Sequence, residues 1–189
     1  MNSFKEDFLE AKEVLEKFIS NEDNFSKLKD AGNIMVASIN NGNKIISCGN
    51  GGSMSDAMHL AEELTGRFRD ERKAIPALSI SDPSHITCTA NDYGFDAIFS
   101  RFIEAHGKSG DVLFAISTSG NSLNILNAVN TARNLGMKVI GLTGKNGGKL
   151  AALCDVEIRA PHSGYSDRIQ EVHIKIIHSL IRYIENNID

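Results

Sequence analysis

The chain has 189 residues, 41% of them hydrophobic, so it can bury one sizeable core, and a single domain over 1–189 is expected. Its formal net charge of −4, without a basic stripe, argues against a nucleic-acid-binding surface. No apolar segment approaches the roughly 20 residues that span a bilayer, so no membrane segment is expected.

The N-terminal part is expected to be helical. Apolar residues recur at helical spacing over 4–19 and again over 28–39, with the second helix ending near 40–42. These helices carry more apolar residues than one buried face needs. We therefore expect 1–42 to form a helical arm that packs against another subunit, ahead of an α/β core over 43–189.

Five short runs of β-prone residues follow, most of them separated by helix-like segments. Several runs lack polar alternation, as expected for strands that are covered on both faces. Alternating strand and helix units predict a parallel sheet with right-handed crossovers, and hence an α/β fold with helices flanking a five-stranded sheet. The expected strands are 44–49, 74–80, 111–117, 138–144 and 155–160, and the expected helices are 53–68, 95–106, 122–135, 147–153 and 165–186.

The first of two notable turns reads GNGGS, at residues 49–53, between a strand and a helix. Open parallel sheets bind ligands at such turns, outside the carboxyl ends of their strands. Met54 stands where the dinucleotide fingerprint needs its third glycine, so a nicotinamide-dependent dehydrogenase is not expected.

The second turn reads STSGNS, at residues 117–122, and offers four hydroxyls beside a helix N-terminus. That combination is typical of a phosphate-binding site. Because no lysine follows at P-loop spacing, a phosphate monoester is favoured over a nucleoside triphosphate with magnesium. A serine-rich helix cap without a ligand remains the alternative.

Two helices carry a second set of polar residues. His59 and Glu63 are four residues apart on one face of the helix after GNGGS, and Gln170 and His178 are two turns apart on the last helix. Such a set could hold a divalent metal such as zinc or supply acid–base groups. Spacing alone does not show that the helices meet, and each pair also fits a solvated contact or a core-edge histidine.

Together these segments resemble the phosphoheptose isomerases of the sugar isomerase (SIS) domain family. The resemblance rests on CGNGGS, DAMHLAEELTGRF, ISDPSHITCTANDYGF, ISTSGNS, LTGKNGG and DRIQEVHIKIIH, and it runs nearly from end to end. It implies a three-layer, flavodoxin-like SIS fold, a homotetramer with active sites at subunit interfaces, and a cytoplasmic location. The implied reaction converts sedoheptulose 7-phosphate to D-glycero-D-manno-heptose 7-phosphate through an enediol, the first step toward ADP-heptose and the heptose of lipopolysaccharide core.

The resemblance also assigns residues. It implies one zinc ion per subunit or active site, held by His59, Glu63, Gln170 and His178. Glu63 is expected to be the base that takes the carbon-bound proton, and His178 the acid–base group that serves the oxygens. The implied substrate contacts are Asn50, Gly51, Gly52, Ser53, Glu63, Arg67, Asn91, Asp92, Ser117, Thr118, Ser119, Ser122, Asp167 and Gln170. For Asp92 and Asp167, a capping role is the alternative.

The main alternative function is a non-catalytic module of the same family that binds a phosphosugar or a replication initiator. Such a module can keep the hydroxyl-rich turn while it lacks the acid–base residues. Both Glu63 and His178 are present here, which favours the isomerase. A sugar-phosphate-sensing transcription regulator would need a DNA-binding domain for which this chain has no room.

Overall fold

The structure, a computed structural model that describes residues 3–162 and 164–188, is built on a five-stranded parallel sheet. The strand order is β2-β1-β3-β4-β5, so the order reverses between β1 and β3. In doubly wound sheets ligands bind at the carboxyl ends of the strands beside this reversal. The strands are β1 (Ile45–Gly49), β2 (Ala77–Ser79), β3 (Val112–Ser117), β4 (Lys138–Thr143) and β5 (Val156–Arg159). The α/β fold and the five parallel strands predicted from the sequence are thus confirmed.

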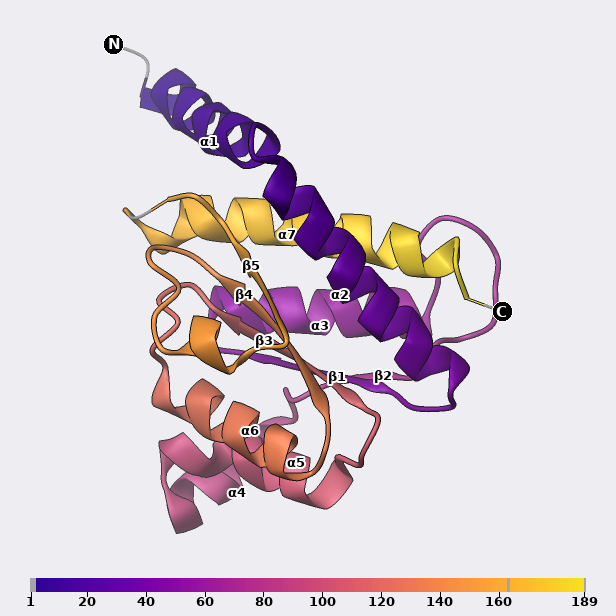
Figure 1. Cartoon of the computed structure of the whole chain (residues 1–189). Coiled ribbons are helices and arrows are strands. Elements are labelled where there is room, and N and C mark those ends of the chain that lie inside the picture. The colour runs from indigo at the N-terminus through magenta and orange to yellow at the C-terminus, as the bar shows by residue number, and fades with distance from the viewer. Residues whose placement is uncertain (1–2, 163, 189) are drawn as a thin grey trace.

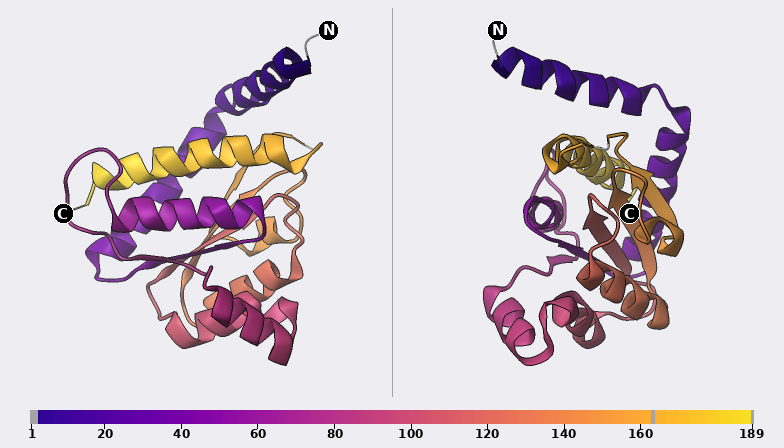
Figure 2. Two further views of the ribbon diagram at one scale, coloured as in Figure 1. Left: turned by 180° about the vertical axis from the view of Figure 1, so that it is seen from behind. Right: turned by 90° about the vertical axis from the view of Figure 1, so that its left-hand side faces the viewer.

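Helices cover both faces of the sheet, as Figures 1 and 2 show. On one face lie α2 (Glu22–Asn40), α3 (Gly52–Thr65) and α7 (Ser166–Glu185), and on the other α4 (Pro83–Tyr93), α5 (Ile98–His106) and α6 (Leu123–Asn134). Every residue of β3 is buried, with Phe114 packing toward α3 and α7 and Leu113 toward α5 and α6. Burial on both faces explains why this strand lacks polar alternation.

The N-terminal arm consists of α1 (Ser3–Ile19) and α2. In Figure 1, α1 projects past the rest of the fold, and Phe4 and Phe8 are 75% and 80% exposed. Arg168 of α7 holds α1 by ion pairs to Glu10 at 2.8 Å and Asp7 at 3.2 Å. The two helices expected over 1–42 are therefore present, and α1 carries an exposed apolar surface.

The helix α4 was not predicted. Asp82 accepts a hydrogen bond from the His85 amide at 2.7 Å, and Pro83 occupies the first turn, so the helix has a regular start. Its only buried residue is Thr89. A helix that buries so little has no clear apolar period, which is why the sequence pattern missed it.

Two expected elements are shorter than predicted. The strand expected over 74–80 is reduced to Ala77–Ser79, because the Ile75 amide donates to Leu64 of α3 and Pro76 has no amide to donate. The helix expected over 147–153 is a short 3₁₀ helix, η2 (Leu150–Leu153), because Gly147 and Gly148 adopt left-handed backbone angles. A second 3₁₀ turn, η1 (Phe95–Ala97), precedes α5.

The loops after β3 and β4 pack backbone against backbone at the carboxyl edge of the sheet. The Gly144 amide donates to Thr118 at 3.1 Å, and the Leu150 amide donates to Gly120 at 2.9 Å. A Cβ on Gly120 would lie 1.9 Å from the carbonyl oxygen of Gly147, so only glycine fits there. The hydroxyl-rich turn is thereby held by its neighbour.

None of the helices in the described part of the chain has the length and apolar character that a membrane crossing requires.

We predict that Gly120→Ala destabilises the fold more than Gly42→Ala. Both glycines have positive φ, 65° and 73°, so alanine costs about 1–2 kcal/mol at either position. Gly42 has no atom near its would-be Cβ, whereas at Gly120 overpacking adds about 1–3 kcal/mol. Urea unfolding measures both variants. Equal losses of stability would show that the loops after β3 and β4 can move apart to make room for the added methyl group.

Candidate functional site

Helices α3 and α7 lie side by side and run in the same direction (Figure 2). Near the start of both helices, a Cβ on Gly52 would lie 2.7 Å from the Gln170 amide group. About two turns farther along, His59 of α3 meets His178 of α7. The spacing of these residues in the sequence did not show whether the two helices meet. In the structure they do.

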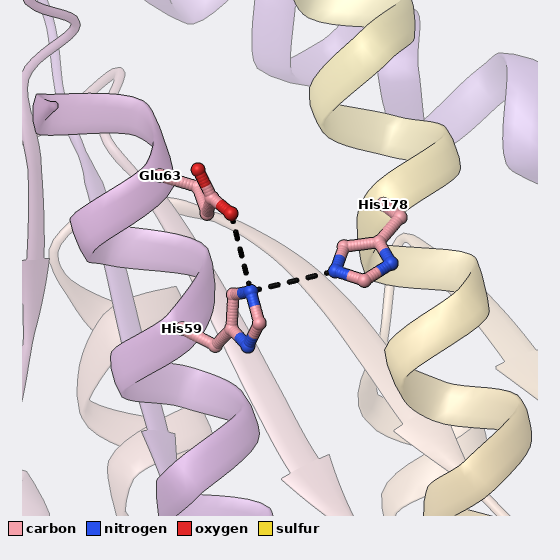
Figure 3. A group of neighbouring side chains, drawn as sticks. All are labelled: His59, Glu63 and His178. Carbon is pink, nitrogen blue, oxygen red and sulfur yellow. Dashed lines mark hydrogen bonds and ion pairs between the residues drawn. The ribbon is translucent and has the colours of Figure 1, made fainter. Parts of the chain in front are cut away.

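Three side chains gather where the helices meet, as Figure 3 shows, and we call them the His–Glu–His group: His59, Glu63 and His178. The Nε2 atom of His59 lies 3.3 Å from Glu63 Oε1 and 3.4 Å from His178 Nε2. His59 also lines a groove of about 540 Å³ between α3 and β2, so the group can be reached from solvent.

The donor atoms fit a metal ion such as zinc. All three lie within 4.8 Å of one another. Tetrahedral zinc with bonds of 2.0–2.1 Å separates neighbouring ligand nitrogens by roughly 3.3 Å, close to the two separations above. Burial lowers the pKa of His178, and the charge of His59 lowers it further while Glu63 opposes both. The neutral imidazole that this favours is the form that binds metals.

Asp56, which the sequence reading did not single out, lies one turn before His59 on α3. Its Oδ2 atom is buried and has no hydrogen-bond partner among the described residues. Burial raises the pKa of Asp56 to about 6, and the charge of His59 opposes this rise. The spacing of 56, 59 and 63 on one helix face was the signal that could have found it. A second acidic group therefore accompanies the His–Glu–His group.

Gln170, expected as the fourth metal ligand, lies apart from this group in a single chain. It is eight residues before His178, about 12 Å along α7, and its amide rests against Gly52. The structure therefore places Gln170 beside the GNGGS loop.

The hydroxyl-rich turn, here called the phosphate cradle (117–122), ends β3 and begins α6. Ser122 is the N-cap residue of α6, yet its side chain makes no capping bond and instead lies 3.2 Å from the Ser117 hydroxyl. Thr118 Oγ1 lies 3.3 Å from the hydroxyl of Ser166 on α7, and Ser119 accepts from the Asn121 amide at 3.2 Å. A simple cap does not explain the Ser122 hydroxyl, so this geometry favours an anion-binding turn.

The GNGGS loop is tied to the cradle by a pair of amides. Asn50 and Asn124 exchange two hydrogen bonds of 2.9 Å, and Asn124 is only 2% exposed. Ser53 is buried at 3% exposure. Asn124 follows the cradle on α6 without any motif of its own, so sequence reasoning missed its role. The two loops form one rigid edge.

The remaining expected contacts are at the surface. Arg67 pairs with Glu71 at 3.8 Å and its side chain is 65% exposed. Asn91 donates to its neighbour Asp92 at 2.8 Å, and Asp167 accepts from the Arg168 amide at 2.9 Å. Within the described residues, these contacts reach neither the cradle nor the His–Glu–His group. A single chain therefore brings together only part of the expected site.

Comparison with known proteins gives consistent matches. Residues 8–144 match the SIS domain family. The chain is 62% identical to the phosphoheptose isomerase of Cytophaga hutchinsonii over 95% of this chain and 94% of that protein. It is 57% identical to that of Vibrio cholerae over 96% and 95%. The solved phosphoheptose isomerase of Francisella tularensis superimposes with a TM-score of 0.89 at 36% identity, over 98% of this chain and 100% of that one.

We predict that Asp56→Asn stabilises the protein more at pH 7.5 than at pH 4 when a chelator has removed any bound metal. The folded pKa of Asp56, about 6, exceeds its ordinary 3.8, so the folded state binds the extra proton. This favourable contribution is lost as the pH rises from about 4 to 6. Allowing for residual solvent contact, the variant should gain about 1–2 kcal/mol between the two pH values.

Denaturant unfolding at both pH values measures this gain, with the exposed Asp70→Asn as the matched control. The same stability change at both pH values would mean that the Asp56 carboxylate is solvated in the folded protein.

Proposed function

The chain belongs to the phosphoheptose isomerases of the SIS domain family, and from that premise we propose how its residues act on the substrate. The enzyme is an aldose–ketose isomerase that isomerises sedoheptulose 7-phosphate in heptose biosynthesis, as the sequence predicted. The high identity to phosphoheptose isomerases and the presence of both Glu63 and His178 favour the isomerase over the non-catalytic alternative. The convergence of His59, Glu63 and His178 from two helices is the observation that carries the proposed mechanism.

We propose that Glu63 is the carbon base. The reaction removes a proton from C1, beside the C2 carbonyl, and an enediol forms as the carbonyl oxygen takes up a proton. The same base then returns a proton to C2, while the C1 hydroxyl loses its proton and becomes the aldehyde. A carboxylate whose side chain is only 19% exposed suits this shuttle.

His178 is the proposed acid–base group for the oxygens. In its protonated form it gives a proton to O2, and it then accepts one from O1, a task for an imidazole because this group gains and loses a proton near pH 7. Because burial lowers its pKa, His178 begins the cycle neutral in most molecules and needs a nearby proton source. Asp56, on the facing helix, supplies a titratable neighbour.

His59, Glu63 and His178 are the residues that would hold a zinc ion, one for each active site. Bound zinc would polarise the substrate carbonyl and stabilise the negative charge that develops on oxygen. Three protein ligands leave one position open, the arrangement of catalytic zinc sites. Glu63 has two carboxylate oxygens and His178 two ring nitrogens, so in each residue the atom that does not hold the ion would remain available to exchange a proton.

The residues proposed to contact the substrate fall into groups that bind different parts of it. We propose that Ser117, Thr118, Ser119 and Ser122 bind the phosphate, and that Asn50, Gly51, Gly52 and Ser53 shape the adjoining wall. Gln170, which rests on Gly52, contacts the sugar there, and a role as metal ligand would require its amide to leave that position. Arg67, Asn91, Asp92 and Asp167 are proposed to reach a substrate held by a neighbouring subunit.

The geometry supports a site shared between subunits of a homotetramer. Glu63 lies eleven residues after Gly52, about 16 Å along α3, and α3 and the cradle helix α6 cover opposite faces of the sheet (Figure 1). Eight bonds of about 1.5 Å join phosphorus to C1 of the substrate, which spans roughly 10 Å when extended. We propose that the cradle of one subunit serves the His–Glu–His group of another.

We predict that Glu63→Gln lowers the rate of isomerisation about 100-fold or more, because the amide keeps the shape but cannot accept the proton. The control is Glu62→Gln, which alters the neighbouring carboxylate, whose side chain is 66% exposed. Turnover of sedoheptulose 7-phosphate is measured for both. A Glu63 variant as active as the control would remove Glu63 from the mechanism.

We predict that two impaired variants restore each other's activity at a substrate concentration well below the KM of the binding-defective variant. Replacing Thr118 and Ser119 by alanine removes two donors to a charged phosphate and should weaken substrate binding at least about tenfold. Mixed with Glu63→Gln and reassembled, this variant should regain activity in sites that combine an intact cradle with an intact Glu63. The assay is activity before and after subunit exchange. Efficient exchange without any recovery would place both parts within one chain.

A further inference from the structure

Arg72 lies in the connection between α3 and β2, and its guanidinium contacts both helices of the site. Its Nη2 donates to the Glu63 carbonyl at 2.6 Å, and its Nη1 to the carbonyls of Leu64 at 2.9 Å and Gly66 at 3.1 Å. Its Nε donates to Glu185 Oε1 at 2.9 Å. Figure 1 shows this connection passing the end of α7.

On α3, the guanidinium closes the C-terminal end of the helix. The last carbonyls of a helix have no amide partner within it, and they carry the negative end of the helix dipole. A cation that donates to several of them at once fixes this end. One of these carbonyls belongs to Glu63 itself, so Arg72 touches the backbone of the proposed base.

On α7, the partner is the last residue of the helix. Glu185 lies seven residues, about two turns, after His178. The two side chains of the pair are only 12% and 8% exposed, so their contact is largely removed from solvent, and loss of either partner leaves a poorly compensated charge. By contrast, Arg67 and Arg69 of the same connection are exposed.

The two helices are thus joined on both sides of the His–Glu–His group. Gln170 rests on Gly52 before it, and Arg72 and Glu185 clamp the helices after it. The 3.4 Å contact between His59 and His178 crosses the gap between α3 and α7, so it depends directly on their separation. A shift of 1 Å would take this distance out of the range for two ligands of one zinc ion.

We propose that Arg72, acting with Glu185, is a positioning residue that sets the spacing of α3 and α7 and hence the geometry of the His–Glu–His group. The inference rests on the proposed function of that group. It assigns to Arg72 a role that is separate from substrate contact.

The test uses the full chain with Arg72→Lys, Glu185→Ala and Glu185→Gln. Arg72→Lys keeps the positive charge but cannot bridge the carbonyls and the carboxylate together. Glu185→Ala removes the tether to α7 and leaves the α3 cap, whereas Glu185→Gln keeps an acceptor. Zinc affinity by competition with a chromophoric chelator, kcat, KM and unfolding stability are measured for each. The control is a truncation in the core beneath the other face, Ile103→Ala, which lowers stability without touching α3 or α7.

We expect Arg72→Lys and Glu185→Ala to bind zinc about 10–100-fold more weakly and to lose kcat, with KM within about threefold of the original. Glu185→Gln should retain most of the zinc affinity and most of kcat. Ile103→Ala should lose stability alone. The proposal is overturned if Ile103→Ala, at a comparable loss of stability, loses as much zinc affinity and kcat as Arg72→Lys and Glu185→Ala.

A protein that isomerises its substrate without binding zinc would refute the proposed metal but not the clamp. In that case, a fall in kcat at constant KM in Arg72→Lys and Glu185→Ala supports the clamp, and an unchanged kcat overturns it.

Discussion

Helices α3 and α7 pack in parallel across one face of the sheet, and the proposed mechanism depends on that contact. His59 and Glu63 lie on one helix, and His178 of the other helix comes within 3.4 Å of His59. The core beneath them makes the contact possible, because Leu60 and Leu64 of α3 and Ile177 and Ile181 of α7 are fully buried in one cluster. The apolar sides of the two helices thus hold their polar sides in register.

The charges around this contact suit a cation. Glu63 and Asp56 place two carboxylates on one face of α3, and the Oδ2 atom of Asp56 is buried without a partner. A lone buried carboxylate is costly, and its pKa rises to about 6 in consequence. The nearby imidazole of His178 is shifted toward its neutral form. A divalent ion between the helices would be attracted by the Glu63 carboxylate and could engage the neutral imidazole.

The GNGGS loop and the phosphate cradle form the other half of the proposed site, and they depend on different contacts. The GNGGS loop and the phosphate cradle follow β1 and β3, on either side of the reversal in strand order, and Asn50 and Asn124 hold them together. This edge is the proposed phosphate site, whereas the His–Glu–His group lies about two to three turns farther along α3. The proposed shared site requires subunits to assemble, and Phe4 and Phe8 of α1 are exposed apolar side chains that could pack against another subunit.

Local pattern was enough to predict the parallel sheet and the face shared by His59 and Glu63, because burial on two sides removes polar alternation and a helix repeats every 3.6 residues. The same logic failed for α4, where Thr89 alone is buried. The sequence also pointed to the cradle, through four hydroxyls at a helix start. Only the tertiary structure decided that His178 meets a residue 119 positions away and that Arg72 joins the ends of two helices. Periodicity determines which side of a helix is apolar. Which side chain of another helix lies opposite a given residue depends on how the whole chain packs.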